Sequence, residues 1–99
     1  MSILHVETDD KRKIVAAALR TKAGLVVSLP APARHHNIIF YMISEGYIKD
    51  EVLASDHGFL TNDGGWVRRQ LALRIAKEAG QLLAEPIAPH AGLFSEDLW

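Results

Sequence analysis

The stretch GFLTNDGGWVRRQLALRIA, Gly58–Ala76, decides the fold because it contains a tight turn followed at once by a helical pattern. Asp63-Gly64 is a strong turn signal, and the flanking runs 57–60 and 65–67 favour short β-strands. After the turn, apolar residues recur at helical spacing, and a glycine stands where the helix should end. This apolar stripe consists of Leu71, Ala72, Ile75, Ala76 and Ala79. The stretch predicts a β-hairpin that leads directly into an α-helix.

A second hairpin is predicted upstream, in KIVAAALRTKAGLVVSLP, residues 13–30. Its valines favour strands, and TKAG, with Gly24 able to adopt a positive φ, can form the turn. Alanines fall on both faces of the first strand. Because alanine side chains leave room for close contact, we expect a helix or another subunit to pack over each side.

A helix is predicted for ARHHNIIFYMISEGY, residues 33–47, between the prolines that end the hairpin and Gly46. Helical spacing divides this helix into two faces. The expected apolar face comprises His36, Ile39, Phe40 and Ile43, and the expected polar face comprises Arg34, Asn37, Tyr41 and Glu45. On this interpretation His36 lies in the core, whereas Arg34 and His35 are free to meet a ligand. The polar connector that follows has room for one helical turn at 51–54.

The predicted order of hairpin, helix, hairpin, helix and tail indicates a small α+β domain with an antiparallel sheet covered by two helices. The 99 residues fit a single domain. Residues 82–99 are expected to form an irregular linker and a docking tail, because prolines and a glycine interrupt them. The closing LFSEDLW should dock as an edge strand or as an arm on a neighbouring subunit. Its acids, Glu96 and Asp97, would then receive an arginine or the hydroxyl groups of a ribose.

Composition and charge limit the partners of the chain. With 48% apolar and 23% charged residues it is typical of a globular protein, and the absence of cysteine favours self-association into a homo-oligomer, such as a dimer, as a source of extra burial. The formal net charge of −1 provides no general basic field, so nucleic acid is not an expected partner. The N-terminus lacks a signal-peptide pattern, and no run of about 18 apolar residues occurs. We therefore expect a cytoplasmic protein with no membrane partner.

Arg68 and Arg69 stand at the start of the last predicted helix, where the helix dipole already presents positive charge. One explanation is structural: one arginine pairs with Asp63 or with a C-terminal acid, and the other stays in water. The other explanation is functional, because free N–H groups at a helix N-terminus and two guanidinium groups would bind a phosphate. A bound phosphate would remove the electrostatic penalty. The residues by themselves leave both explanations open.

Neighbouring side chains could extend this anion site into a nucleotide pocket. Two aromatic residues flank the turn; such residues usually pack in the core, but they can also stack on a base. An arginine and a histidine at the start of the first helix would add further donors. The predicted ligand-binding set is Arg34, His35, Phe59, Asn62, Trp66, Arg68, Arg69 and Asp97. Within it, Asn62 or Asp97 would reach the hydroxyl groups of a ribose.

Catalytic and metal-binding motifs are not evident in the sequence. The five histidines match no ligand spacing such as HExxH, and thiols are absent, so no metal is expected. The serines lack a nucleophile elbow, and the glycines form no phosphate-binding or dinucleotide pattern, so no catalytic residue and no cofactor are expected. A hydrolase that uses His35 or His57 as its base, with Asp56 or Asp63 beside His57, is the least favoured alternative.

The order of motifs resembles a family of small phage and prophage proteins, and the correspondence covers most of residues 14–99. Its most specific parts are Gly58-Phe59, Arg69 with Ala72, Ala79-Gly80-Gln81 and Ser95–Trp99. We identify this pattern with the first-described Thoeris anti-defence proteins, which act as sponges for immune nucleotide signals. Membership would imply a protein of the host cytoplasm that binds its ligand without turnover.

The resemblance implies glycocyclic ADP-ribose as the ligand and, as in some members, cyclic dinucleotides or trinucleotides at a separate site of a hexamer. The departures from the family pattern are Gly65 and Trp66 in place of Arg and Phe, Arg68 in place of an acid or Asn, and Leu71 in place of Glu. An arginine at position 68 would prefer phosphate, whereas the usual acid or amide would contact a base or ribose. The main alternative function is a phage inhibitor that docks its TNDGG turn or its SEDLW arm on a host protein.

Overall fold

The computed structural model describes residues 12–86 and 88–99, and a four-stranded antiparallel sheet lies at its centre. The order of the strands across the sheet is β2-β1-β3-β4, so the two predicted hairpins join through β1 and β3. The strands are β1 (Ile14–Arg20), β2 (Val26–Ser28), β3 (Asp56–Thr61) and β4 (Trp66–Arg68). Both predicted hairpins are therefore confirmed.

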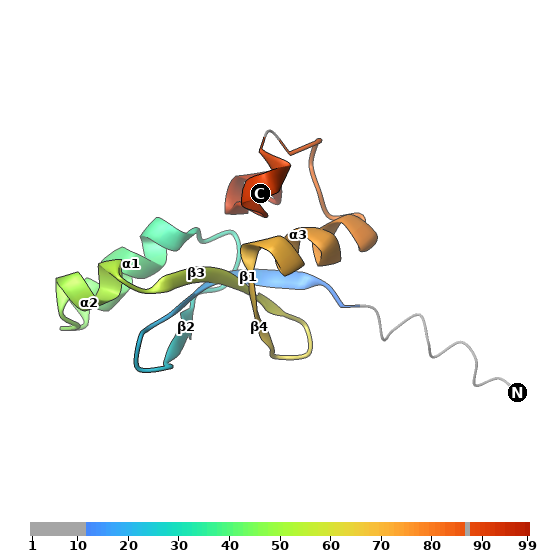
Figure 1. Ribbon diagram of the computed structural model, residues 1–99. Helices are drawn as coiled ribbons and strands as arrows, with labels where there is room; N and C mark the ends of the chain where they lie inside the picture. Colours follow the sequence, from blue (N-terminus) through green and yellow to red (C-terminus); the bar gives the residue numbers. More distant parts are fainter. Residues whose placement is uncertain (1–11, 87) are drawn as a thin grey trace, which may run out of the picture.

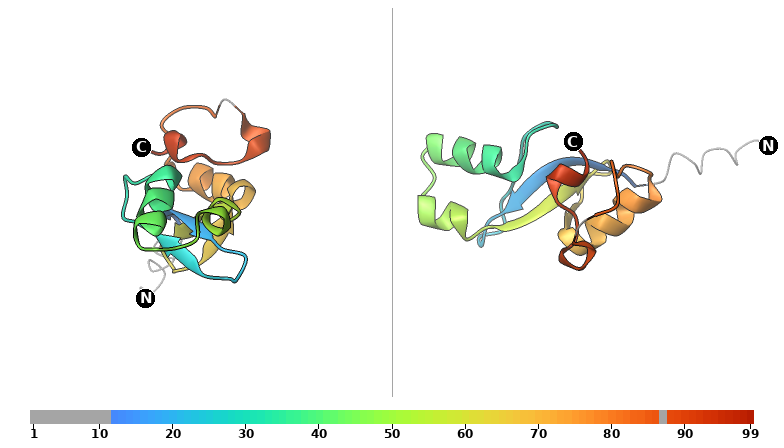
Figure 2. Two further views of the ribbon diagram at one scale, coloured as in Figure 1. Left: turned by 90° about the vertical axis from the view of Figure 1, so that its left-hand side faces the viewer. Right: turned by 90° about the horizontal axis from the view of Figure 1, so that it is seen from above.

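Helices cover one face of this sheet, which confirms the predicted α+β fold (Figures 1 and 2). They are α1 (His35–Ser44), α2 (Lys49–Leu53) and α3 (Arg69–Glu78), followed by the short 3-10 turns η2 (Pro89–Ala91) and η3 (Ser95–Asp97). The expected pair of covering helices is α1 and α3, and the connector between α1 and β3 adds α2. In the part of the chain that the structure describes, no helix is long and apolar enough to span a membrane.

The core lies between the sheet and the helices. Phe59 of β3 is fully buried and pairs across the sheet with Ala17 of β1, which leaves room for the larger ring. The other fully buried large apolar side chains come from β1, α1, α2 and the tail: Leu19, Ile38, Met42, Val52 and Leu93. Burial of a side chain of this size contributes about 1.5–3 kcal/mol, so these few residues account for much of the packing.

The opposite face of the sheet is filled by side chains of its own strands. Ala18 is fully buried there and pairs with Gly58, and the ring of Trp66 lies so close to Gly58 that an added Cβ would come within 2.5 Å of it. The guanidinium of Arg20 lies 4.3 Å from the centroid of the Trp66 ring. Packing of helices on the other side of the sheet confirms half of the prediction for β1, and the packing of another subunit over this side stays a prediction.

The face that the first helix turns toward the core matches the prediction only in part, because Ile39 and Ile43 pack against the core as expected but the other two predicted residues do not. His35, Ile38 and Met42 are buried, whereas His36 is exposed and Phe40 is 67% exposed. Apolar residues occupy most of the helix circumference, so helical spacing alone could not choose between two neighbouring faces. The hydrogen bond and ring contacts of His35 with β3 select the observed face.

The C-terminal tail folds back over the helices as η2 and η3, and the predicted edge strand is wrong (Figure 1). Leu93 is fully buried and Leu98 is 8% exposed, so the tail docks on its own chain. The N–H of Leu93 donates to the carbonyl oxygen of Arg69 at 2.9 Å. Gly92, with a φ of +87°, permits this approach because a Cβ there would lie 2.5 Å from the Cβ of Arg69. The tail is thereby fixed beside the first turn of α3.

Replacing Gly92 with Ala should destabilise the protein more than the same change at Gly46. Both glycines have a positive φ, 87° and 97°, but nothing lies within 4 Å of a Cβ added at Gly46. Gly46→Ala should cost roughly 1–2 kcal/mol for the backbone conformation alone. Gly92→Ala should cost at least about 2 kcal/mol more, because the backbone of Arg69 must move. Denaturant unfolding measures the loss of stability in both variants, and equal losses would contradict the close contact between Gly92 and Arg69.

Candidate functional site

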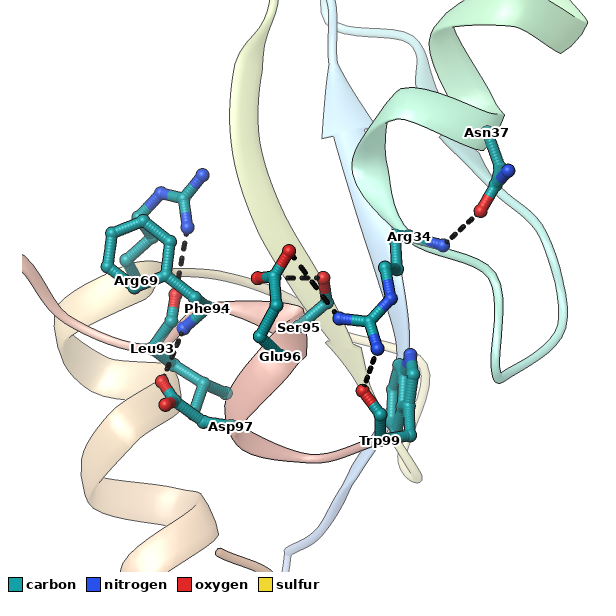
Figure 3. Close-up of polar contacts among 9 residues, drawn as sticks. All are labelled: Arg34, Asn37, Arg69, Leu93, Phe94, Ser95, Glu96, Asp97 and Trp99. Atoms are coloured by element: carbon teal, nitrogen blue, oxygen red, sulfur yellow. Dashed lines mark hydrogen bonds and ion pairs between the residues drawn. The ribbon is translucent and has the colours of Figure 1, made fainter. Parts of the chain in front are cut away.

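A small polar cleft lies where the start of α1, the start of α3 and the tail meet (Figure 3). Its volume is about 210 Å³. The residues that line it are Arg34, His35, His36, His57, Arg69, Phe94, Ser95 and Glu96. Of the predicted ligand-binding residues, the cleft brings together Arg34, His35 and Arg69.

Arg69 is the first residue of α3, and its guanidinium group forms one wall of the cleft. Nη1 donates to the carbonyl of Leu93 at 2.9 Å, and Nη2 donates to Nδ1 of His57 at 3.0 Å. The guanidinium also lies 4.4 Å from the centroid of the Phe94 ring. Burial lowers the pKa of Arg69, but an arginine remains charged at any physiological pH. Both hydrogen-bond acceptors are neutral, so they orient this positive charge without cancelling it.

Arg34 supplies the second guanidinium group from the N-terminal boundary of α1. Its backbone N–H donates to Oδ1 of Asn37 at 2.8 Å, and its Nη2 donates to the main-chain oxygen of Trp99. Its Nη1 is buried and makes no hydrogen bond within residues 12–86 and 88–99. Oε2 of Glu96 forms an ion pair with this Nη1 at 3.5 Å. Arg34 therefore has hydrogen-bonding capacity that a ligand could use.

Two stacked imidazoles form the floor between the arginines. The rings of His35 and His57 have centroids 4.8 Å apart and planes inclined by only 8°. Nε2 of His35 donates to the carbonyl of Gly58 at 2.8 Å, and Nδ1 of His57 accepts from Arg69. Burial lowers the pKa of His35 to about 4, and burial followed by the charge of Arg69 lowers the pKa of His57. Both rings are neutral at neutral pH, so the positive charge of the cleft comes from the guanidinium groups.

The structure reverses the predicted roles of the two adjacent histidines. His35, expected to be free, is 7% exposed and hydrogen-bonded to β3, whereas His36, expected in the core, is exposed at the rim. The ring of His36 contacts Phe40 edge-on, with centroids 6.3 Å apart. His35 thus supports the cleft from below, and a donor role toward a ligand falls to the arginines.

Arg68 and Trp66 lie on the other face of the sheet, so the predicted joint anion trap of Arg68 and Arg69 is wrong. Consecutive residues at the end of a strand point to opposite faces, and only one of two adjacent arginines can reach the cleft. Arg68 pairs with Asp56 at 3.7 Å and lies 5.5 Å from the centroid of the Trp66 ring. The predicted ion pair of one arginine exists, but its partner is Asp56, not Asp63 or a C-terminal acid.

The structure does not place the remaining predicted ligand residues in the cleft. Phe59 is fully buried, with its ring edge-on to His35 at 5.1 Å, so it has no face for a base and that prediction is wrong. Asn62 accepts from the backbone N–H of Lys13 at 3.0 Å in the β3–β4 turn. Asp97 accepts from the backbone N–H of Phe94 at 2.9 Å and so caps η3. These contacts give Asn62 and Asp97 structural roles.

Sequence reasoning did not identify Phe94 and Glu96 as lining residues. The tail acids were predicted to receive an arginine or the hydroxyl groups of a ribose, and Glu96 forms an ion pair with Arg34, the first of these alternatives. The partner could not be named from spacing, because 61 positions separate the two residues along the chain. In the least favoured alternative His57 would pair with Asp56 or Asp63. Nδ1 of His57 instead accepts from Arg69, and Asp63 accepts from the hydroxyl of Thr61. Within residues 12–86 and 88–99, no group of three or more potential ligands could hold a metal ion.

One comparison with known proteins gave a match. The family model described as phage T4 y16D protein matches residues 13–99, a range that includes every residue lining the cleft. No curated protein and no solved structure matches the chain.

Acidification should destabilise the fold through His35. Burial holds the pKa of His35 near 4, below its ordinary value of 6.5, so the unfolded chain binds the proton first. The free energy of unfolding that the neutral His35 ring contributes is fully present above about pH 6.5 and is lost as the pH falls toward 4. The loss should be on the order of 3 kcal/mol, measured by denaturant unfolding at pH 7 and pH 4.

The variant His35→Gln should reduce this pH dependence, because its amide can donate to Gly58 but does not titrate. The control is His36→Gln, which changes an exposed ring that lies outside the stacked pair. An unchanged loss of stability in His35→Gln would show that another group is responsible.

Proposed function

We propose that this chain, which belongs to the phage T4 y16D protein family, is a non-enzymatic anti-defence protein that sequesters a cyclic nucleotide signal. The cleft supports a phosphorylated ligand, and the resemblance of the motifs to the Thoeris anti-defence proteins supports an immune nucleotide. Glycocyclic ADP-ribose is the proposed ligand, and cyclic dinucleotides and trinucleotides are further candidates. The protein would act in the host cytoplasm.

The observation that carries this proposal is the meeting of Arg34 and Arg69 at one cleft (Figure 3). Among the described residues, the buried Nη1 of Arg34 makes an ion pair with Glu96 but no hydrogen bond, and Arg69 is held by neutral acceptors. Leaving charged groups partly out of water costs free energy that a bound anion can offset. Guanidinium groups also match the oxygens of a phosphate in geometry as well as in charge. The cleft therefore favours a phosphate or a pyrophosphate group.

The size of the cleft indicates how a nucleotide would sit. A volume of about 210 Å³ suits the phosphate-bearing part of a dinucleotide better than the whole molecule. The base and ribose would then extend across the rim, where the ring of Phe94 is 38% exposed. Aromatic rings in such positions commonly stack on nucleobases. We thus assign to Phe94 the stacking role that the sequence had suggested for Phe59 and Trp66.

Binding without turnover is supported by the contacts of the groups that could act chemically. His35 and His57 each have a ring nitrogen committed to a hydrogen bond within the protein. The hydroxyl of Ser95 donates to Glu96 at 3.4 Å, and the residue is 2% exposed. These contacts favour a role in shaping the cleft over one as a base or nucleophile.

Glycocyclic ADP-ribose should raise the melting temperature of the wild-type protein, and the ligand should be recovered intact after heat denaturation. Arg34→Gln and Arg69→Gln should each weaken binding by roughly tenfold to a hundredfold, because each removes charge-assisted hydrogen bonds. Isothermal titration calorimetry measures the affinity. The matched control is Arg74→Gln, which removes the same charge from the exposed side of α3.

Two outcomes would contradict the proposed binding site or binding without turnover. Recovery of only cleaved nucleotide would indicate an enzyme. Equal losses of ligand affinity in Arg69→Gln and Arg74→Gln would indicate a general effect of charge and not a binding site at the cleft. Light scattering on the same samples tests the predicted homo-oligomer.

The alternative proposal, an inhibitor that binds a host protein, draws support from the apolar surface around α1 and α2. Phe40, Ile48 and Leu53 are 67%, 62% and 54% exposed, which is typical of contact surfaces when such residues are close together. The SEDLW arm is a weaker candidate for docking, since Ser95 and Leu98 are buried within the chain. Calorimetric titrations that show no heat with any cyclic nucleotide would favour this alternative.

A further inference from the structure

Among the described residues, Glu96 is the acidic side chain that lines the cleft, and it projects from η3 between the two arginines (Figure 3). Its Oε2 lies 3.5 Å from Nη1 of Arg34, and its Oε1 accepts from the hydroxyl of Ser95 at 3.4 Å. Its charge also acts on the far wall, where it opposes the lowering of the pKa of Arg69 by burial. A carboxylate thus already occupies the region to which the proposed phosphate would bind.

The contacts of this carboxylate are weak. Both of its contacts are long for charge-assisted hydrogen bonds, which are commonly near 2.8 Å. The side chain of Glu96 is 69% exposed, whereas that of Arg34 is 30% exposed. Ion pairs with one partner so open to water contribute little to stability. Glu96 can therefore turn out into solvent at small cost, while Arg34 stays anchored by Trp99.

We infer that Glu96 is the internal counter-ion of the cleft, and that a phosphate group of the ligand displaces it on binding. This inference rests on the proposed function. A carboxylate and a phosphate cannot both lie between Arg34 and Arg69 without strong repulsion at that distance. The phosphate can form bidentate bonds with the guanidinium groups, whereas the carboxylate of Glu96 reaches them only through a long contact.

Because the ligand must displace Glu96, this residue affects affinity differently from a residue that contacts the ligand directly. Every phosphorylated ligand must displace the same carboxylate, so Glu96 lowers all affinities by one common factor. Anions that bind weakly, such as inorganic phosphate, are thereby kept from filling the cleft. A nucleotide that makes additional contacts at the rim can still bind.

Replacing Glu96 with Gln should tighten the binding of inorganic phosphate, inorganic pyrophosphate and ADP-ribose by a similar factor of about ten, because one unit charge is removed beside the bound anion. Glutamine retains the size and the hydrogen-bonding capacity of the side chain. Isothermal titration calorimetry of wild type and variant with each of the three probes measures the factor. The matched control is Glu45→Gln, at the exposed C-terminal boundary of α1.

Thermal melting provides a second test that does not require titrations. Without ligand, Glu96→Gln should melt only slightly below the wild type, because the ion pair that it loses is exposed and weak. At the same saturating concentration of pyrophosphate it should show the larger upward shift, since the stabilisation by a bound ligand grows with the logarithm of the ligand concentration divided by Kd. Glu45→Gln should show neither change.

The outcomes separate the inference from the function on which it rests. If Glu96→Gln tightens phosphate but weakens ADP-ribose, the carboxylate stays in place to accept ribose hydroxyls, and displacement is wrong. If no affinity changes although the wild type binds, Glu96 is not the counter-ion and the proposed function stands. If neither protein binds any of the three probes or glycocyclic ADP-ribose, the proposed function fails, and the inference fails with it.

Discussion

The structure depends most on the contacts of Arg69, where β4 passes into α3. The carbonyl of Arg69 accepts from the N–H of Leu93, and its guanidinium donates to the carbonyl of Leu93 and to His57. One residue thus joins helix, sheet and tail, and Gly92 permits the close approach. These contacts set the position of the tail next to the start of α1. Phe94 and Glu96 line the cleft only because this junction holds the tail in place.

The electrostatics of the cleft follow from that junction. Two guanidinium groups lie above a pair of stacked imidazoles that burial keeps neutral, and Glu96 is the carboxylate that faces them. Partly buried positive charge of this kind is costly unless an anion accompanies it. Neutral acceptors orient Arg69 and leave its charge available to the proposed phosphate, whereas Arg34 pairs with Glu96. The same arrangement links the stability of the ligand-free protein to the internal carboxylate.

The two faces of the sheet differ in what they contact. The helical face carries the core and the cleft, whereas the other face is closed by Trp66 lying over Gly58 and flanked by Arg20 and Arg68. The pairing of Arg68 with Asp56 balances charge locally on that second face. Adjacent residues at the end of β4 therefore serve different surfaces, and a single anion site cannot use both arginines.

The sequence by itself determined the elements whose signals are local. The Asp63-Gly64 turn, the hairpin that leads into α3 and the termination of helices at glycines depend on φ preference and on spacing within a few residues. Only the tertiary structure decided which face of α1 is buried, because its apolar residues nearly encircle the helix and the contact of His35 with β3 makes the choice. The pairing of Arg34 with Glu96 likewise depends on where the tail docks. Burial and charge partners arise from contacts between distant segments, and no local pattern encodes them.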